Sequence, residues 1–448
     1  MSDILNIGAS GVRAYQNAIG TISENIANSG VEGYSRRSTI LNEVSASTST
    51  ITRREVTAAS GVATSGIARA GDAFKEVAVQ TAASDLAGSD SAIQWLDQIQ
   101  TALTGNKLSD QLTTFFNAAN GVAADPSAAA PRTAMLDAAQ GVADSFTATG
   151  EALGTVAANL DATAQDSATT FNGLAAALAK VNDGLSRNVP GTMGSAQLLD
   201  QRDQLIEQMS AIANVSVSYD DVGRATLRVG GATGPVIVQN NNAGSLTYAR
   251  GDDGAVAYAT HFGGNITSTA ISGGALAGIA DGAQRLAEAQ NQLGTLAGSF
   301  VDGMNGLQAA GADLDGNAGA AMFAIGDNPT DVSVTLSSGR GIAAAAPGAG
   351  PLDNSNLIAL TSLRNSADYE GQVTQLVTDT ASALSARQTI ADAQAAIHDN
   401  AVADRDSVSG VNLDSEAVDL LKFQQAYSAS SRVIQTARDI FQSILDIR

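Results

Sequence analysis

Side chains that commonly perform acid–base or metal chemistry are scarce in this chain. Its two histidines, His261 and His398, lie far apart in the sequence without flanking carboxylate patterns, and there is no cysteine. A zinc site would need carboxylates in place of the usual thiolates and imidazoles, which is an unusual ligand set. We therefore interpret each histidine as a surface residue and expect neither a metal nor a cofactor.

One acidic segment, Asp313-Leu314-Asp315-Gly316-Asn317, has a composition that could bind calcium. Its spacing does not fit an EF-hand loop, because glycine comes too early and the twelfth position is Ala324 rather than glutamate. We interpret this segment as a turn between a helix and a strand.

The sequence also lacks the common motifs of nucleotide binding and nucleophilic catalysis, namely the P-loop, the dinucleotide fingerprint and the G-x-S-x-G elbow. The glycine-rich segment 230–234 lies between two expected strands, which favours a hairpin turn. Asp200-Gln201-Arg202-Asp203 forms a polar cluster on an expected helix, where it could make an ion-pair network or contact another subunit. No nucleophile or base lies beside it, so the sequence gives no positive case for an enzyme.

Composition argues against two classes of partner. The 448 residues carry a formal net charge of −21, and such a surface repels nucleic acid phosphates and anionic lipid. The first residues, Met1 to Asn6, lack the basic and apolar regions of a secretory signal, and no apolar run approaches the roughly 20 residues that span a bilayer. We expect a protein that is cytoplasmic or that leaves the cell without a cleaved signal.

Two helical segments, expected at residues 3–28 and at about 414–446, carry matching apolar seams. Asp414 or Ser415 is the expected cap of the second helix. Apolar residues recur in steps of three and four, the pattern of helices that pack side by side. Each seam is too narrow for its helix to bury alone, so the two termini should pair with each other or with neighbouring subunits. The seam residues are Leu5, Val12, Tyr15, Ile19, Ile22, Ile26, Leu413, Leu420, Phe423, Tyr427, Ile434, Ala437, Phe441 and Ile444.

The intervening sequence predicts a mainly α, α+β protein of elongated shape. Helical periodicity covers 72–122 with a break at Gly105-Asn106, a segment of roughly 50 residues that ends before Pro190, and then 195–213, 273–308, 355–364 and 371–406. Residues 34–71 predict an extended hairpin, and 215–271 predict a small antiparallel β domain inserted between helices. The expected domains are a terminal coiled coil (1–33 and 412–448), a long-helix rod (34–214 and 272–411) and the β insert (215–271).

The segment Asn25 to Arg37 resembles the N-terminal signature of bacterial flagellar rod, hook and hook-associated proteins. A second motif, Leu198 to Leu205, is similar to an internal motif of the hook-associated protein 1 family and favours that family within the group. Further similarity covers nearly the whole chain in the right order and is weakest in the β insert. The residues that carry the two motifs are Asn25, Asn28, Gly33, Tyr34, Arg36, Leu199, Asp200, Gln201, Arg202, Asp203 and Leu205.

This resemblance implies a structural subunit at the junction between hook and filament. It implies export in unfolded form through the flagellar type III apparatus and assembly outside the cell as a ring at the distal end of the hook. The implied partners are the hook protein, the second junction protein and an export chaperone that holds the C-terminal helix. The terminal seams would then form the inner tube, disordered in the monomer and folding on assembly.

Two alternatives remain open at this point. The chain could be another axial protein, such as the hook protein or the second junction protein, although the motif at 198–205 argues against both. It could also be a secreted enzyme or adhesin with axial-type ends and an activity in 215–271, a region that holds one histidine and no cluster of nucleophiles.

Overall fold

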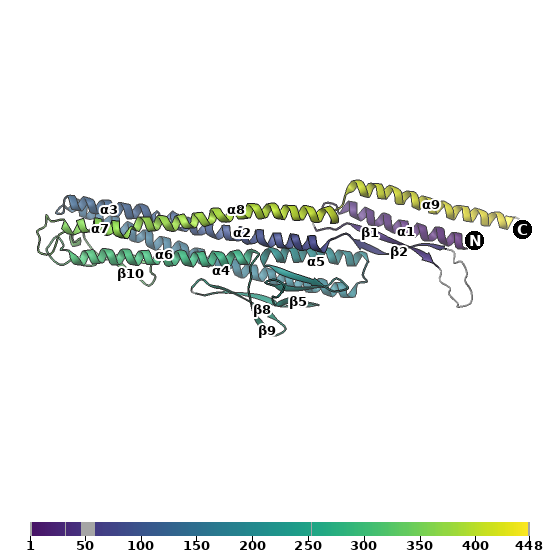
Figure 1. The fold of residues 1–448 in the computed structure, drawn as a ribbon, viewed down its shortest axis with the longest axis horizontal. Helices are drawn as coiled ribbons and strands as arrows, with labels where there is room; N and C mark the ends of the chain where they lie inside the picture. The colour runs from purple at the N-terminus through teal and green to yellow at the C-terminus, as the bar shows by residue number, and fades with distance from the viewer. Residues whose placement is uncertain (1, 32, 46–58, 252, 447–448) are drawn as a thin grey trace.

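The computed structural model describes residues 2–31, 33–45, 59–251 and 253–446. It is an elongated molecule whose N- and C-termini lie at the same end (Figure 1). The terminal helices α1 (Ser2–Ala27) and α9 (Leu413–Asp446) pack side by side at that end. The mainly helical α+β architecture predicted from the sequence is confirmed.

A bundle of long helices forms the rest of the rod. The 59 residues of α4 correspond to a helix about 88 Å long at 1.5 Å per residue. Its buried face repeats Ala, Leu, Val and Phe with helical spacing, and long neighbouring helices cover that face. The helices of the rod are α2 (Ala73–Gly105), α3 (Leu108–Ala124), α4 (Ala129–Arg187), α5 (Met193–Ile212), α6 (Ala275–Ala310), α7 (Ser355–Ala367) and α8 (Tyr369–Ser409).

Two kinds of packing hold the bundle together. Aromatic rings surround Phe300 of α6, whose ring centroid lies 5.2 Å from that of Phe323 and 5.4 Å from that of Tyr369, the first residue of α8. Elsewhere small residues let helix backbones approach closely, as where α6 crosses α2. A Cβ at Gly282 would lie 2.6 Å from Cβ of Trp95, so any side chain there would force the helices apart.

The β domain lies on the side of the rod against α4 (Figure 1). Asn182 of α4 donates to the carbonyls of Ala225 and Asn240 and accepts from the amide of Ala225. One antiparallel sheet consists of β3 (Val215–Tyr219), β4 (Ala225–Val229), β5 (Val236–Gln239) and β6 (Asn242–Ala243). A second consists of β7 (Ser245–Arg250), β8 (Val256–Phe262) and β9 (Asn265–Thr269).

A hairpin of β1 (Arg37–Ser45) and β2 (Ala59–Arg69) packs on α1. The hydroxyls of Thr21 and Thr39 are 3.0 Å apart, and Ser10 Oγ accepts from the amide of Val62. The domain boundaries predicted from the sequence assign this hairpin to the rod. In the structure it packs against the N-terminal helix α1. The predicted hairpin also includes residues 46–58, which lie outside the described residues.

Other elements differ from the prediction in detail. Neither Asp414 nor Ser415 caps α9, because the helix begins at Leu413 and Asn412 Oδ1 accepts from the amide of Ser415 instead. Strand β9 was not predicted, because only Ile266 among its residues is strongly apolar and four of its five side chains are exposed. Also unpredicted were β6, β10 (Phe323–Ile325) and a 3-10 turn at Gly339–Gly341; β10 pairs antiparallel with β11 (Val332–Val334). In the described part of the chain, no helix is long and apolar enough to cross a membrane.

Candidate functional site

The terminal helices run antiparallel and approach each other closely. Gly8 lies opposite Ile434, where a Cβ would come within 2.7 Å of Ile434 Cγ1, and a Cβ at Gly11 would come within 2.6 Å of Ser430 Oγ. Farther along the pair, the ring centroids of Tyr15 and Phe423 are 6.1 Å apart. The absence of a side chain at the two glycines therefore permits this contact between backbones.

The predicted seam residues are covered to different degrees. Ile22 and Ala437 are buried, whereas Phe441 and Ile444 are 52% and 49% exposed. With Gly8 opposite Ile434, the last turns of α9 extend beyond the start of α1, as Figure 1 also shows. Of the remaining seam residues, Leu5, Val12, Tyr15, Ile19, Ile26, Leu420, Phe423 and Ile434 are half-buried, and Leu413 and Tyr427 are exposed.

A second face of α1 is buried more completely than the seam, and sequence reasoning missed it. Ala14, Ala18 and Thr21 are at most 4% exposed, and Asn25 is fully buried. These residues share the face that contacts β1 and β2. The available signal was the spacing of three and four residues between these small side chains.

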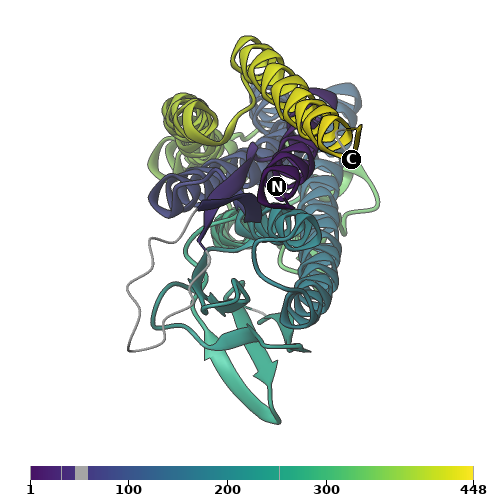
Figure 2. The ribbon, with the colours of Figure 1, turned by 90° about the vertical axis from the view of Figure 1, so that its right-hand side faces the viewer.

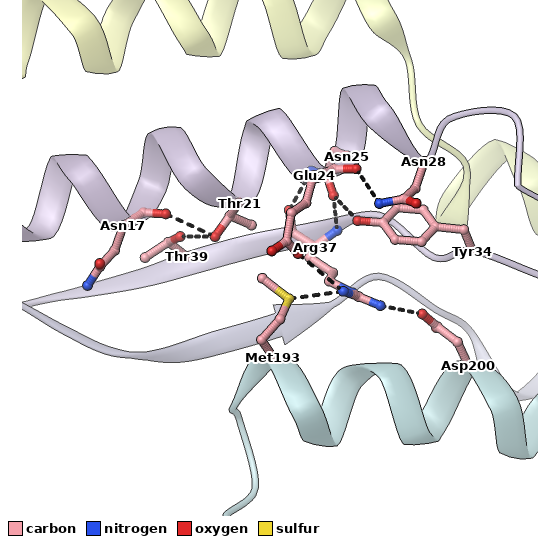
Figure 3. A network of polar contacts seen from close by, with 10 residues as sticks. All are labelled: Asn17, Thr21, Glu24, Asn25, Asn28, Tyr34, Arg37, Thr39, Met193 and Asp200. Carbon is pink, nitrogen blue, oxygen red and sulfur yellow. Dashed lines mark hydrogen bonds and ion pairs between the residues drawn. The ribbon is translucent and has the colours of Figure 1, made fainter.

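Asn25 is the centre of a polar network where α1 meets the hairpin (Figure 3). Its Oδ1 accepts from Tyr34 OH at 2.8 Å and from the amide of Arg37 at 3.0 Å, and its Nδ2 donates to the carbonyl of Arg37 at 2.8 Å. The guanidinium of Arg37 lies over the ring of Tyr34, 4.7 Å from the centroid. Burial is the main cause that raises the pKa of Tyr34, so its hydroxyl remains a donor to Asn25 at neutral pH.

The same asparagine links the network to the C-terminal helix. Glu416 of α9 is fully buried, and its carboxylate accepts from Asn25 Nδ2 at 2.9 Å and from Arg36 Nε at 2.6 Å. The amide of Arg36 also donates to the carbonyl of Ser409 at the end of α8. These bonds fix the start of α9 against both α1 and the rod.

Ion pairs continue the network from the hairpin into α5. Asp200 accepts from Arg37 at 2.7 Å and from Arg69 at 2.6 Å, and Asp203 pairs with Arg69 at 2.7 Å and with Arg202 at 2.6 Å. Burial acts to lower the pKa of Arg69, but Asp203 and Asp200 outweigh it and raise that pKa above its ordinary value. The terminal helices, the hairpin and the rod are thus connected by alternating charges.

We call this network the joint. It connects segments that are almost 400 residues apart in sequence, as the bond between Asn25 and Glu416 shows. The joint consists of Asn25, Tyr34, Arg36, Arg37, Arg69, Asp200, Arg202, Asp203 and Glu416.

The structure therefore brings the two sequence motifs together at one place. Of the motif residues outside the joint, Asn28 donates to the carbonyl of Glu24 near the end of α1, and Gly33 adopts a positive φ of 75° in the following turn. Leu199 lies against Gly223, whose added Cβ would be 2.8 Å from Leu199 Cδ2. Leu205 packs against the rod core, and Gln201 is exposed.

Sequence reasoning did not place Arg37, Arg69 or Glu416 in a functional site. Glu416 had a usable signal, because it stands at a seam position between apolar residues, where a carboxylate needs a buried partner. Arg37 is the last residue of the first motif but was not among the residues taken to carry it. For Arg69 the sequence carried no signal, since its partners lie on α5.

The joint suits mechanical connection rather than bond chemistry. Its side chains are arginines, carboxylates, an amide and a phenol that pair with one another, although Arg37 Nε is buried without a hydrogen-bond partner. In the described residues no group of three or more His, Cys, Asp or Glu side chains is arranged to hold a metal ion. His261 Nε2 lies 3.3 Å from the hydroxyl of Thr247, and His398 Nδ1 lies 3.8 Å from Asp399, so neither histidine belongs to the joint.

Comparison with known proteins gives two family matches. Residues 93–323 match the model of the flagellar hook-associated protein FlgK helical domain, which is just over half of the chain. Residues 405–447 match the C-terminal region of flagellar basal body rod FlgEFG proteins. The first match covers the end of α2, all of α3, α4, α5 and α6, and the β domain, and the second covers α9.

Full-length relatives and a solved structure agree with these matches. Flagellar hook-associated protein 1 of Salmonella typhimurium is 27% identical, with 100% of both chains covered. The protein of the same name from Bacillus subtilis is 23% identical, covering 97% of this chain and 96% of the other. The flagellar hook junction protein FlgK of Burkholderia pseudomallei has a similar fold, with a TM-score of 0.50 and 22% identity over 55% of this chain and 46% of that one. The chain belongs to the FlgK family of flagellar hook-associated proteins.

Proposed function

We propose that this protein is a structural subunit of the bacterial flagellum that forms the junction between hook and filament. The observation that carries this proposal is the match of the rod to the hook-associated helical domain. The family is a structural family of the flagellum, and we propose that the chain has no enzymatic activity.

The finer parts of the proposal concern partners and location. The subunits would form a ring at the distal end of the hook, with the hook protein on one side and the second junction protein on the other. The chain would reach this extracellular site unfolded, through the flagellar type III apparatus, with an export chaperone on the C-terminal helix. Similarity of residues 405–447 to rod proteins supports a shared mode of assembly at the C-terminus.

We propose that the terminal helices acquire their stable form only in the assembled ring. On α9 only Glu416 and Ala437 are buried, and Phe441, Ile444 and Leu445 are about half exposed. Isolated helices that bury so little apolar surface are marginal in water. Strong amide protection of residues 3–28 in the purified monomer would contradict this part of the proposal.

The joint would set the orientation of the terminal helices relative to the rod. Buried ion pairs add little net stability, but their fixed geometry can specify one arrangement among several. Because the hairpin contacts α1 and contributes to the joint, we propose a terminal unit of residues 1–71 and 412–448. The rod would then comprise 72–214 and 272–411, with 215–271 as the inserted β domain.

Electron microscopy of a deletion strain tests the proposed function. Hooks without filaments, together with flagellin released into the medium, are expected if the protein joins the two structures. Normal filaments would reject the junction role. Loss of the hook itself would instead indicate another axial protein.

A further inference from the structure

Strand β3 has a free edge in the described part of the chain. Its sheet has the strand order β3-β4-β5-β6, so β4 pairs with one side of β3 and no described strand pairs with the other. The β domain lies to one side of the helical bundle in the end view of Figure 2, and residues of β3 and α2 line a common cavity. An unpaired strand edge presents a row of N–H and C=O groups that another chain can bind.

The register of β3 decides which of its backbone groups face away from β4. Val215 lies opposite Val229, and Tyr219 lies opposite Ala225. The amide of Val229 donates to the loop before β5, and the amide and carbonyl of Ala225 bond to α4. Both residues of β4 therefore point their backbone groups away from β3, which makes these positions non-hydrogen-bonded pairs. Because the pattern repeats every two residues, the N–H and C=O groups of Val215, Val217 and Tyr219 point outward from the sheet.

A cavity of about 290 Å³ lies between this edge and α2. Within the described residues, nothing bonds to the outward backbone groups of Val215 and Val217. Val77 and Asp85, which are both exposed, line the cavity from α2. Ser84 also lines it, and its buried hydroxyl has no hydrogen-bond partner in the described structure. The volume is close to the roughly 300 Å³ at which ligand pockets begin, so it suits a short stretch of extended chain rather than a folded element.

The α2 side of the cavity indicates the chemistry of such a segment. Phe74 and Val77 are 87% and 53% exposed, one turn apart on the same side of the helix, and an apolar side chain would cover them. Asp85, about two turns farther along, has no ion pair in the described part of the chain, and a cationic side chain would neutralise it. A matching segment is extended and mainly apolar, with one lysine or arginine.

We propose that the free edge of β3 and the adjoining side of α2 bind an extended, basic segment of a different protein by strand addition. Main-chain hydrogen bonds to Val215 and Val217 supply the affinity, and contacts with Val77 and Asp85 supply the specificity. A second copy of this chain matches less well, because its exposed edge strand β9 has no lysine or arginine and leaves Asp85 unneutralised. This binding site is separate from the joint and goes beyond the proposed junction role.

Site-specific photo-crosslinking in intact flagella tests the proposal. A benzophenone amino acid replaces Phe74 in one arm and Ile266 of β9, which is 69% exposed, in the control arm. Position 74 should give an adduct heavier than the 45.1 kDa chain, and mass spectrometry should place the crosslink in a segment of another protein that contains a lysine or arginine. An adduct with a second copy, a segment without a basic residue, the same adduct from position 266, or no adduct would overturn the proposal.

A charge reversal tests the match to a basic segment. Asp85→Lys should lower the yield of the position 74 adduct by about threefold or more, because an attraction becomes a repulsion. Asp90→Lys is the matched control, since Asp90 is also exposed on α2 but does not line the cavity. Equal yields from the two variants would contradict the proposal.

Proline substitutions test the strand pairing itself. Val217→Pro removes an outward N–H and leaves the bonds between β3 and β4 in place, because an edge strand accepts proline where the N–H faces away from the sheet. Ser216→Pro is the control that removes an inward N–H. We expect Val217→Pro to unfold near the wild-type temperature and to lose the adduct, and Ser216→Pro to unfold at a lower temperature.

An adduct of Val217→Pro at the wild-type yield would refute strand addition. If Val217→Pro does not fold, the comparison of Asp85→Lys with Asp90→Lys decides. Failure of the proposed junction role is seen separately, as normal filaments in the deletion strain.

Discussion

Glu416→Gln is the sharpest test of the joint. The carboxylate is fully buried and accepts two hydrogen bonds, one from the charged guanidinium of Arg36 and one from the amide of Asn25. Glutamine keeps the size of the side chain but replaces one acceptor oxygen with an NH₂ group. One of the two donors then faces another donor, and of the two carboxylates at Arg36 only Asp419, 3.6 Å away, remains.

The expected cost follows from the surroundings of the two partners. Breaking a fully buried ion pair costs about 3–5 kcal/mol. The Arg36 side chain is 35% exposed, so water can solvate its charge after the substitution. We therefore expect Glu416→Gln to destabilise the packing of α9 at the joint by about 1.5–3 kcal/mol, the range for a hydrogen bond to a charged group. Since 1.4 kcal/mol corresponds to a factor of ten, incorporation into the flagellum should fall by about tenfold or more.

The assay is a competition between subunits. Wild type and Glu416→Gln are produced together in one strain, hook–filament junctions are isolated, and mass spectrometry measures the ratio of the two chains. Asp439→Asn is the matched control, because it removes an equal charge from an exposed position on the same helix. Equal depletion of the two variants, or none of either, would refute the role assigned to the joint.

Three further predictions concern the seam and the β domain. Gly8→Val should impair incorporation because its Cβ would meet Ile434, whereas Gly20→Val, with no neighbouring atom within 4 Å, should not; the competition assay measures both. Leu420→Ala should change the thermal unfolding of the monomer little, because we propose that the terminal helices become stable only on assembly, but it should cost about 2–5 kcal/mol where Leu420 is fully packed in the flagellum; thermal unfolding and the competition assay separate the two effects, and equal effects would argue against assembly-driven burial. The pKa of Asp161 lies below its ordinary value, mainly because Arg250 donates hydrogen bonds to its carboxylate. The ionised carboxylate therefore stabilises the fold above about pH 3.9, and this stabilisation is lost as the pH falls through the native pKa. Asp161→Asn should therefore lower stability by about 1–2 kcal/mol at pH 7, with a gap to wild type that narrows toward pH 3 in thermal unfolding scans.

Sequence periodicity predicted the long helices well because they are uniform. In α4 the apolar residues repeat with one period from Met135 to Leu185, and Pro190 follows soon after its end. Nothing along that segment competes with the helix, so local pattern and tertiary packing agree. The strand β9 shows the opposite case, because its pairing with β8 holds a polar segment that its own side chains do not mark as a strand.

The joint could be predicted only in part, for a different reason. The motif residues were recognised in two segments, but their meeting depends on the path of the chain through the hairpin and α5. The bond between Asn25 and Glu416 joins residues whose local sequences carry no information about each other. Small residues such as Ala14 and Ala18 were ambiguous for the same reason, since alanine suits a solvent-facing helix surface as well as a buried one.

The contrast between the seam and the joint bears on how such a subunit can be both exported and assembled. An entirely apolar connection between the terminal helices and the rod would be at least as stable as ion pairs. It would, however, leave aggregation-prone apolar segments exposed on the unfolded chain. The joint instead uses Asn25, Arg36 and Glu416, which are well hydrated when the chain is unfolded. When the chain folds, their directional bonds select one orientation, while the half-exposed seam leaves apolar surface available to neighbouring subunits. Orientation thus comes from within the chain, and we infer that most of the stability of the terminal helices comes from assembly.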